Sequence, residues 1–282
     1  MEKVIEQTAR LFLISALRYF VIAGVFFALF YRLFKGRFGK NKIQPREATG
    51  KDFAREILHS MSSMLVMTVI AVLILFTPFR QYTLVYGSLT ATDAWYLPLS
   101  VALSLVIHDT YFYWMHRTLH HPVLFRAAHL LHHKSTNPSP WASYSFHFFE
   151  AITEGAVLVL LVMVMPMHPI AIGLFVVLGL VINVYGHLGY EITPRWLRDT
   201  FLFEIVNTSV YHNLHHRKFK GNYGLYFRVW DRLMGTEHPD YVAEYDRLQE
   251  RRFGAAKTPA RSANTAVKTV AVLLPVMWCL LT

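Results

Sequence analysis

The sequence has little cysteine and little charge. It contains one cysteine, Cys279, and only 16% of its 282 residues are charged. A single thiol cannot form a disulfide within the chain or supply the sulfur ligands of a structural zinc site or an iron–sulfur cluster. Soluble domains usually carry about a quarter charged residues, so this low charge argues against an ordinary soluble protein.

Apolar residues make up 54% of the chain and form long runs. A helix needs about 20 residues to cross the hydrocarbon core of a bilayer. Runs of this kind predict membrane spans at 11–31, 58–79 and 95–115. A longer run, 151–186, has two prolines near its middle (MPMHPIAIG), which predicts a helical hairpin of two short spans. The run 265–282 is a weaker sixth candidate, because Lys268 and Pro275 interrupt it.

The distribution of lysine and arginine predicts the orientation of these spans. The loop 32–56 holds eight basic residues against three acids, whereas 80–94 holds only one of each. Because basic loops remain in the cytoplasm, 32–56 is predicted to be cytoplasmic. Alternation of the spans then places 116–150 and 187–264 on the same side. The net charge of +10 follows from this topology and from attraction to anionic lipid, so no nucleic-acid partner is expected.

Histidine is concentrated and patterned in the middle of the chain. Thirteen of the fifteen histidines lie between residues 108 and 216. His116 and His120 have i, i+4 spacing, and the motif HxxHH occurs twice, at 129–133 and 212–216. Residues at i, i+3 and i+4 share one face of a helix. Two such helices and the HxxxH pair can surround a dinuclear metal centre, and neutral imidazole suits iron, zinc, copper and nickel.

The histidine clusters lie at the ends of predicted spans. The first begins where the span 95–115 leaves the membrane, and His187 directly follows the hairpin 151–186. A substrate could therefore reach a metal site there from the lipid. The predicted fold is all-α: a helical membrane protein of four to six spans with a cytoplasmic helical cap that carries a histidine-rich dimetal site. Its expected location is a bacterial inner membrane, or the endoplasmic reticulum membrane in a eukaryote.

The isolated histidines are interpreted from their context. His187, beside GYE, is predicted to be a ligand, whereas His121 is one histidine too many beside His120. His147, in SYSFHFFEAI, is equally consistent with a ligand, a lining residue or a residue that supports a ligand. Three peripheral histidines are interpreted as structural: His59, His168 and His238.

Polar residues near the end of the span 95–115 are candidates for residues that support the ligands. His108 and Asp109 are costly inside a membrane and are expected to face a cavity or a partner. Asp109 shares a helix face with Tyr113 and His116, so we expect it to hold a histidine N–H and fix the tautomer of that ring. Weaker candidates for the same role are Glu150 and Glu191.

Three segments resemble the fatty acid hydroxylase and sterol desaturase superfamily. They are HDTYFYWMHRTLHHPVLFRAAHLLHHKSTNPSPWASYSFHFFE, GHLGYE and YHNLHHRKFKGNYGLYFRVWDRLMGTEHPDY, which together cover roughly residues 100–240. Carried over by motif, the metal ligands are nine histidines: His116, His120, His129, His132, His133, His187, His212, His215 and His216. The adjacent His120 and His121 leave open which of them closes the first box.

The resemblance implies a non-haem di-iron centre that uses O2 and two external electrons to hydroxylate or desaturate a lipid. The lipid would come from the bilayer and could be a fatty acyl chain, a sphingoid base or a sterol-like molecule. With no haem-binding or flavin-binding domain visible in 282 residues, the electrons would come from a separate reductase, ferredoxin or cytochrome. The chain is divided into N-terminal spans with a basic loop (1–95), a catalytic domain (96–240) and a basic connector with an apolar segment (241–282).

Other kinds of metal protein fit the pattern less well. A metal transporter would place its ligands at the middle of several spans, whereas these clusters lie outside the spans. A bis-histidine haem protein would need single histidines in facing spans. A zinc hydrolase would need an open metal position and a base, as in HExxH, which is absent. The remaining alternative is a histidine-rich membrane metal transporter or metal-binding protein without oxygenase activity.

Overall fold

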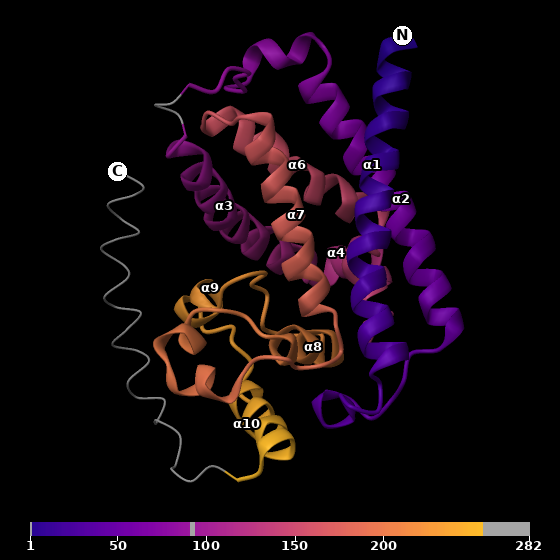
Figure 1. Cartoon of the computed structure of the whole chain (residues 1–282), viewed down its shortest axis with the longest axis vertical. Helices are drawn as coiled ribbons and strands as arrows, with labels where there is room; N and C mark the ends of the chain where they lie inside the picture. The colour runs from indigo at the N-terminus through magenta and orange to yellow at the C-terminus, as the bar shows by residue number, and fades with distance from the viewer. Residues whose placement is uncertain (1, 91–93, 256–282) are drawn as a thin grey trace.

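The computed structural model describes residues 2–90 and 94–255 of the chain (Figure 1). Every regular element in this part is a helix, and the β-type contacts there are three isolated bridges. The prediction of an all-α fold is therefore confirmed. The predicted sixth span, 265–282, lies outside the described residues.

Five long helices make up the larger part of the molecule (Figure 1). They are α1 (Glu2–Phe27), α2 (Gly50–Leu75), α3 (Tyr96–Leu119), α6 (Phe148–Val164) and α7 (Pro169–Gly186), and a π-helical turn, η1 (Ala28–Leu33), continues α1. They overlap the predicted spans and the predicted hairpin. Among the described residues, three helices are long and apolar enough to cross a membrane: Glu2–Leu33, Gly50–Leu75 and Pro169–Gly186. These apolar helices are those of a membrane protein.

Local capping fixes where these helices begin. Thr49 and Asp52 form a capping box at the start of α2, and the Asp52 carboxylate accepts a hydrogen bond from the Thr49 N–H at 2.8 Å. Pro169 begins α7, where the missing N–H is not needed. The His168 side chain accepts a hydrogen bond from the N–H of Ile170 and caps this helix. His168 thus has the structural role predicted for it.

Short helices lie between and after the long ones, and those that follow α7 occupy the lower part of Figure 1. Those between α3 and α6 are α4 (Pro122–Leu124), η5 (Phe125–His129), α5 (Leu130–His133) and η6 (Pro140–Tyr144). Those after α7 are η7 (Arg195–Asp199), η8 (Phe201–Glu204), α8 (Ser209–Lys218), α9 (Val229–Leu233) and α10 (Tyr241–Phe253). Two further 3-10 helices flank α2 in sequence: η2 (Gly39–Asn41) and η3 (Pro78–Tyr82).

The helices after α7 have an aromatic core of their own. Four ring-bearing side chains are buried together between η8, α8 and α10: Phe203, Tyr211, Tyr241 and Tyr245. The Arg228 guanidinium enters this core, 4.9 Å from the Phe203 ring centre, and its Nε donates to Glu237 at 2.8 Å. Because the buried cation is paired, it does not destabilise the core. This core holds α8, which carries the second HxxHH motif.

The basic loop between α1 and α2 packs against this C-terminal region. The N–H of Ile43 donates to the carbonyl of Gly189 at 3.0 Å. The Gln44 side-chain amide donates to Asn213 Oδ1 at 2.7 Å. The loop and the second HxxHH motif therefore lie at the same end of the long helices, as the predicted topology requires.

Candidate metal centre

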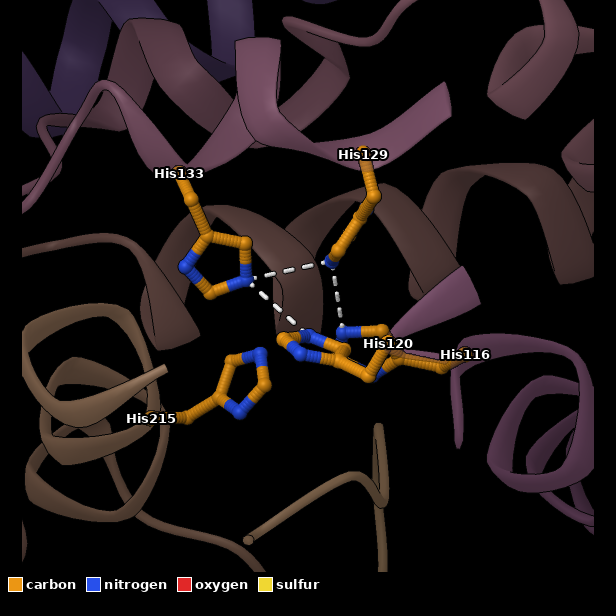
Figure 2. A group of neighbouring side chains, drawn as sticks. All are labelled: His116, His120, His129, His133 and His215. Atoms are coloured by element: carbon orange, nitrogen blue, oxygen red, sulfur yellow. Dashed lines mark hydrogen bonds between the residues drawn. The ribbon is translucent and has the colours of Figure 1, made fainter. Parts of the chain in front are cut away.

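The structure brings all nine predicted ligands together at the junction between the long and the short helices. Their rings form two groups, and within each group the ligand nitrogens lie within 4.8 Å of one another. Site A contains His116, His120, His129, His133 and His215, whose rings face one another in Figure 2. Site B contains His132, His187, His212 and His216. His121 is exposed and belongs to neither site, so the structure places His120, and not His121, beside the other rings.

Each HxxHH motif contributes to both sites. The first motif gives its outer two histidines, 129 and 133, to site A and its middle histidine, 132, to site B. The second motif does the reverse, giving 212 and 216 to site B and 215 to site A. Successive residues are about 100° apart around an α-helix, so positions i and i+4 nearly superpose while i+3 points about 100° away from i+4. The middle histidine of each motif can therefore reach the neighbouring site.

The other ligands lie at the ends of helices. His116 occupies the last turn of α3, and His187 is the residue that ends α7. His129 closes the π-helical turn η5 immediately before α5 begins. π-helical turns occur frequently at functional sites, because they change the direction of side chains within a helix.

The Nε2 atoms within each site are separated as ligands of one metal ion would be. In site A, His129 Nε2 lies 3.0 Å from His116 Nε2 and 3.1 Å from His133 Nε2. In site B, His187 Nε2 lies 3.3 Å from His132 Nε2, and His212 Nε2 lies 3.1 Å from His216 Nε2. Two nitrogens about 2.1 Å from one metal ion are about 3.0 Å apart at a right angle and about 3.4 Å apart at the tetrahedral angle.

Backbone carbonyls fix the tautomers of several rings. Four of them accept hydrogen bonds from Nδ1: Tyr223 from His116 (2.8 Å), Ser145 from His132 (3.2 Å), Asn183 from His187 (2.8 Å) and Gly221 from His215 (2.7 Å). A carbonyl oxygen can only accept, so each of these Nδ1 atoms carries the proton. Each Nε2 atom then presents a lone pair.

These tautomers make the close Nε2 contacts suitable for a cation. His132 and His187 direct lone pairs at each other across 3.3 Å, and neither nitrogen has a proton to donate. The Nε2 of His215 is buried without a hydrogen-bond partner among the described residues. A metal ion between such lone pairs removes their repulsion, so the donor set fits a pair of metal ions.

Burial keeps the imidazoles neutral, which is the form that binds metal. It lowers the pKa of His187 to about 4. Burial, followed by the charge of neighbouring imidazoles, also holds the pKa values of His212, His215 and His216 well below their usual range. Neither group contains a carboxylate or thiolate ligand from the described residues, so the protein ligands are all nitrogen.

Glu150 is the predicted carboxylate that contacts one of these histidines. Its Oε1 accepts a hydrogen bond from His129 Nδ1 at 2.8 Å, which makes the imidazole a stronger ligand. Glu191, the other weak candidate, instead accepts from the Tyr185 hydroxyl and from the N–H of Val210. It ties the end of α7 to the beginning of α8.

Contrary to expectation, Asp109 does not hold a histidine N–H. Its Oδ1 accepts from the backbone N–H groups of Tyr226 at 2.7 Å and Phe227 at 3.1 Å. Helix periodicity places Asp109 on the His116 face of α3, but the loop after α8 packs there and presents its own donors. Asp109 is connected to His116 through this loop, because the same loop supplies the Tyr223 carbonyl that accepts from His116.

Tyr113 also contacts the C-terminal region rather than a ligand. Its hydroxyl lies 2.9 Å from the Thr236 hydroxyl and accepts a hydrogen bond from Arg117 at 3.1 Å. His147 lies outside both sites and caps α6 by accepting from the N–H of Phe149.

Asp231 is a supporting residue that sequence reasoning did not single out. Its carboxylate accepts from the N–H groups of Tyr223 at 2.9 Å and Gly224 at 2.7 Å. It thus holds the loop whose carbonyls orient His116 and His215. The available signal was its place in WDRLMGTE, the last segment of the family resemblance.

A cavity of about 410 Å³ lies among α1, α2, α3, α6 and α7. It is lined by one side of α7 from Pro169 to Asn183, a helix length of about 21 Å. The carbonyl of Asn183 accepts from His187 Nδ1, so one end of the cavity lies one helical turn from a residue of site B. The size and mainly apolar lining suit a single apolar ligand.

Comparisons with known proteins agree with this geometry. Residues 101–236 match the model of the fatty acid hydroxylase family. A lathosterol oxidase from Mus musculus is 28% identical over 249 residues, which cover 84% of this chain and 78% of the relative. A delta(7)-sterol 5(6)-desaturase from Gibberella zeae is 30% identical over 243 residues, covering 82% of this chain and 64% of the relative.

A delta(7)-sterol 5(6)-desaturase from Aspergillus fumigatus is 28% identical over 216 residues, covering 76% of this chain. The chain spans only 59% of that relative's length. No solved structure matches the chain. All nine histidines of sites A and B lie within the matched region, 101–236. Over residues 101–236 the chain is thus similar to the fatty acid hydroxylase family.

Proposed function

We propose that the protein is a membrane-bound, non-haem di-iron oxygenase that hydroxylates or desaturates a lipid, with O2 as co-substrate. The observation that carries this proposal is the convergence of imidazole lone pairs at two adjacent sites. The sites adjoin each other, since the ring centres of His133 in site A and His216 in site B are 4.8 Å apart. Ions held by the two sites would therefore be neighbours.

Iron is the metal proposed for both sites. Imidazole also suits zinc, copper and nickel, so the choice of iron rests on the similarity to the fatty acid hydroxylase family. When bound, a di-iron pair supplies the oxidising chemistry that protein side chains lack. Asp109, Tyr113 and Glu150 are proposed to support the ligand set, Glu150 directly and the other two through the C-terminal region.

The protein's own residues hold, orient and shield the reactants. The carbonyls of Ser145 and Asn183 keep the Nε2 lone pairs of site B directed inward. Glu150 does the same for His129 in site A. The apolar cavity along α7 would hold a lipid from the bilayer and exclude water from its reacting end.

The names of the relatives make a sterol the first substrate to test. Electrons are proposed to come from an external reductase, ferredoxin or cytochrome. Sites A and B are proposed to face the cytoplasm, because the basic loop 32–56 packs at the same end of the long helices. The expected location is a bacterial inner membrane, or the endoplasmic reticulum membrane in a eukaryote.

The test combines metal analysis with lipid oxidation. We expect the purified chain to hold two iron atoms and, with O2 and a reductant, to remove two hydrogens from lathosterol in vesicles or add one oxygen atom to it. His132→Ala should abolish conversion, while His121→Ala, which changes an exposed residue outside both sites, should not. If lathosterol is inert, mass spectrometry of lipids from a deletion strain identifies the substrate.

Two results would contradict the proposal. One is a single metal ion per chain, and the other is full lipid oxidation by His132→Ala. Tight metal binding without oxidation of any lipid would instead support the alternative, a membrane metal transporter or metal-binding protein.

A further inference from the structure

The cavity along α7 is polar at one end and apolar at the other. Apart from the exposed Arg80, its lining near the start of α7 is apolar and includes Leu75, Val85 and Ile172. Toward Asn183 the lining includes a set of polar side chains: His108, Tyr144, Glu154 and Tyr226. A single ligand would therefore meet very different surroundings at its two ends.

Contacts along the helices place this polar set at the end near site B. Tyr144 follows Ser143, whose carbonyl accepts from the Asn183 amide at 2.7 Å. The Tyr226 hydroxyl lies one turn of α7 before Asn183, because a Cβ added at Gly179 would be 2.8 Å from it. Asn183 in turn accepts from His187 of site B.

The remaining two polar residues belong to the same place. The Tyr226 hydroxyl lies 2.9 Å from His108 Nδ1, so these two side chains form a pair. Glu154 lines the same cavity and lies one turn of α6 after Glu150, which contacts His129 of site A. Arg18, on α1, lines the cavity as well.

Two of these polar side chains, His108 and Glu154, have polar atoms without a hydrogen-bond partner among the described residues. His108 is 91% buried, since only 9% of it is exposed, and its Nε2 has no hydrogen-bond partner among the described residues. The Glu154 carboxylate likewise has no hydrogen bond within the part of the chain that the structure describes. Unpaired polar groups are costly in an apolar interior and mark binding sites inside membrane proteins.

The apolar surroundings of the cluster limit the kind of group that can satisfy it. A carboxylate, a phosphate or an amine is disfavoured, because a charge is costly away from water. A hydroxyl is neutral and both donates and accepts. It can donate to Glu154 while it accepts from His108 or Arg18.

We propose that this cavity binds one apolar molecule with a single neutral hydroxyl, held at the site B end by Glu154 and His108. The apolar body extends along α7 toward Pro169. This inference rests on the proposed function in one respect. If the bound molecule is the substrate, its hydroxyl-bearing end, and not its far end, lies beside the metal centre. Glu154 and His108 are then specificity-determining residues.

Binding of matched ligands tests the hydroxyl requirement without turnover. Tritiated lathosterol is bound to the full chain in detergent micelles and displaced by unlabelled lathosterol, its 3-ketone or its sulfate ester. The ketone keeps the oxygen but loses the donated hydrogen bond, so we expect it to bind about tenfold more weakly. The sulfate should bind more weakly still. A long-chain alcohol and its aldehyde, run in parallel, distinguish a straight-chain from a sterol source.

Variants on α6 assign the effect to Glu154. In Glu154→Leu the tenfold preference for the alcohol should fall to about twofold or less, whereas Glu154→Gln keeps an acceptor and should retain part of it. Leu158→Ala is the matched control, because Leu158 lines the same cavity one turn further along α6. It should weaken both ligands equally. An apolar residue at 154 suits a membrane helix, so loss of folding is not expected.

A blocking variant verifies the location. A Cβ added at Gly173 meets nothing within 4 Å, and Gly173 lines the cavity, so Gly173→Phe can fill the space without displacing neighbours. It should abolish displaceable binding of every ligand. Three results would each overturn the inference. The unmodified chain could bind alcohol and ketone equally, Glu154→Leu could keep the full preference for the alcohol, or Gly173→Phe could bind the ligands normally.

The two proposals can fail separately. Binding needs neither O2 nor electrons, so the pattern above without any lipid oxidation would contradict the proposed function alone. Oxidation by a chain that does not distinguish alcohol from ketone would contradict this inference alone.

Discussion

His129 Nδ1 lies 2.8 Å from Glu150 Oε1, and both side chains are buried. The contact joins the π-helical turn η5 to the first turn of α6, so it connects the first HxxHH motif to the helical hairpin. The second carboxylate oxygen of Glu150 has no hydrogen-bond partner among the described residues. The carboxyl group therefore acts on one ligand, whose imidazole it makes more basic by accepting from Nδ1.

Removal of this carboxylate should weaken metal binding. Loss of a carboxylate that supports a histidine ligand usually lowers metal affinity by about 10- to 100-fold, and we expect Glu150→Leu to fall in this range. Competition with a chromophoric chelator measures the change. Glu150→Gln keeps an acceptor for Nδ1 and should lose less. Equal affinities for the unmodified chain and Glu150→Leu would show that the contact does not support the ligand.

Single substitutions in the second HxxHH motif should affect different ions. His215→Ala removes a ligand from site A, whereas His216→Ala removes one from site B. If each site holds one ion, each variant should lose the ion of its own site first during dialysis against chelator, and the spectra of the remaining ions should differ. Identical spectra for the two one-metal forms would contradict the assignment of ligands to two sites.

Asp231 should contribute both to the free energy of unfolding and to metal binding. In Asp231→Ala the N–H groups of Tyr223 and Gly224 lose a buried acceptor. Hydrogen bonds to a charged group are each worth about 1.5–3 kcal/mol, so we expect the free energy of unfolding to fall by about 3 kcal/mol. Denaturant unfolding in detergent measures it, and metal content should fall as well. Lost stability with unchanged metal affinity would show that the loop does not orient His116.

The metal-free protein should lose stability in mild acid. The pKa of an unfolded histidine is 6.5, and in the folded protein that of His187 is about 4. Between these values the unfolded chain binds protons that the folded chain excludes. The free energy of unfolding should therefore stay constant above pH 6.5 and fall as the pH drops toward 4, by up to about 1.4 kcal/mol per pH unit for each such histidine.

Thermal unfolding of the chelator-treated protein from pH 8 to pH 4 measures this dependence. His121→Ala serves as the control, because His121 is exposed and should leave the slope unchanged. A flat profile would mean that the buried imidazoles become protonated as readily as exposed ones.

Sequence patterns predicted the parts of this structure that depend on local spacing. Apolar runs located all five long helices, since a span needs only length and composition. Motif spacing located the nine histidines that come together. The two prolines near the middle of the run 151–186 predicted a turn in the hairpin, which lies between α6 and α7 at residues 165–168.

Features that depend on tertiary packing were not accessible in the same way. Periodicity placed Asp109 on the face of His116, but not the loop that occupies that face and takes its hydrogen bonds. Glu154 is one of two acids in an otherwise apolar helix, and its position in a cavity depends on four other helices. The division of each HxxHH motif between two sites likewise requires both motifs to be docked.

This division has a consequence for the order in which the protein matures. Four of the five rings of site A have been made once the chain reaches residue 133, whereas site B then has only His132, and His187 joins it later. A nascent chain can therefore capture its first ion at site A before α8 exists. The second ion must wait for α8, and because α8 also brings His215 to site A, the arrival of one short helix completes both coordination spheres in a single step.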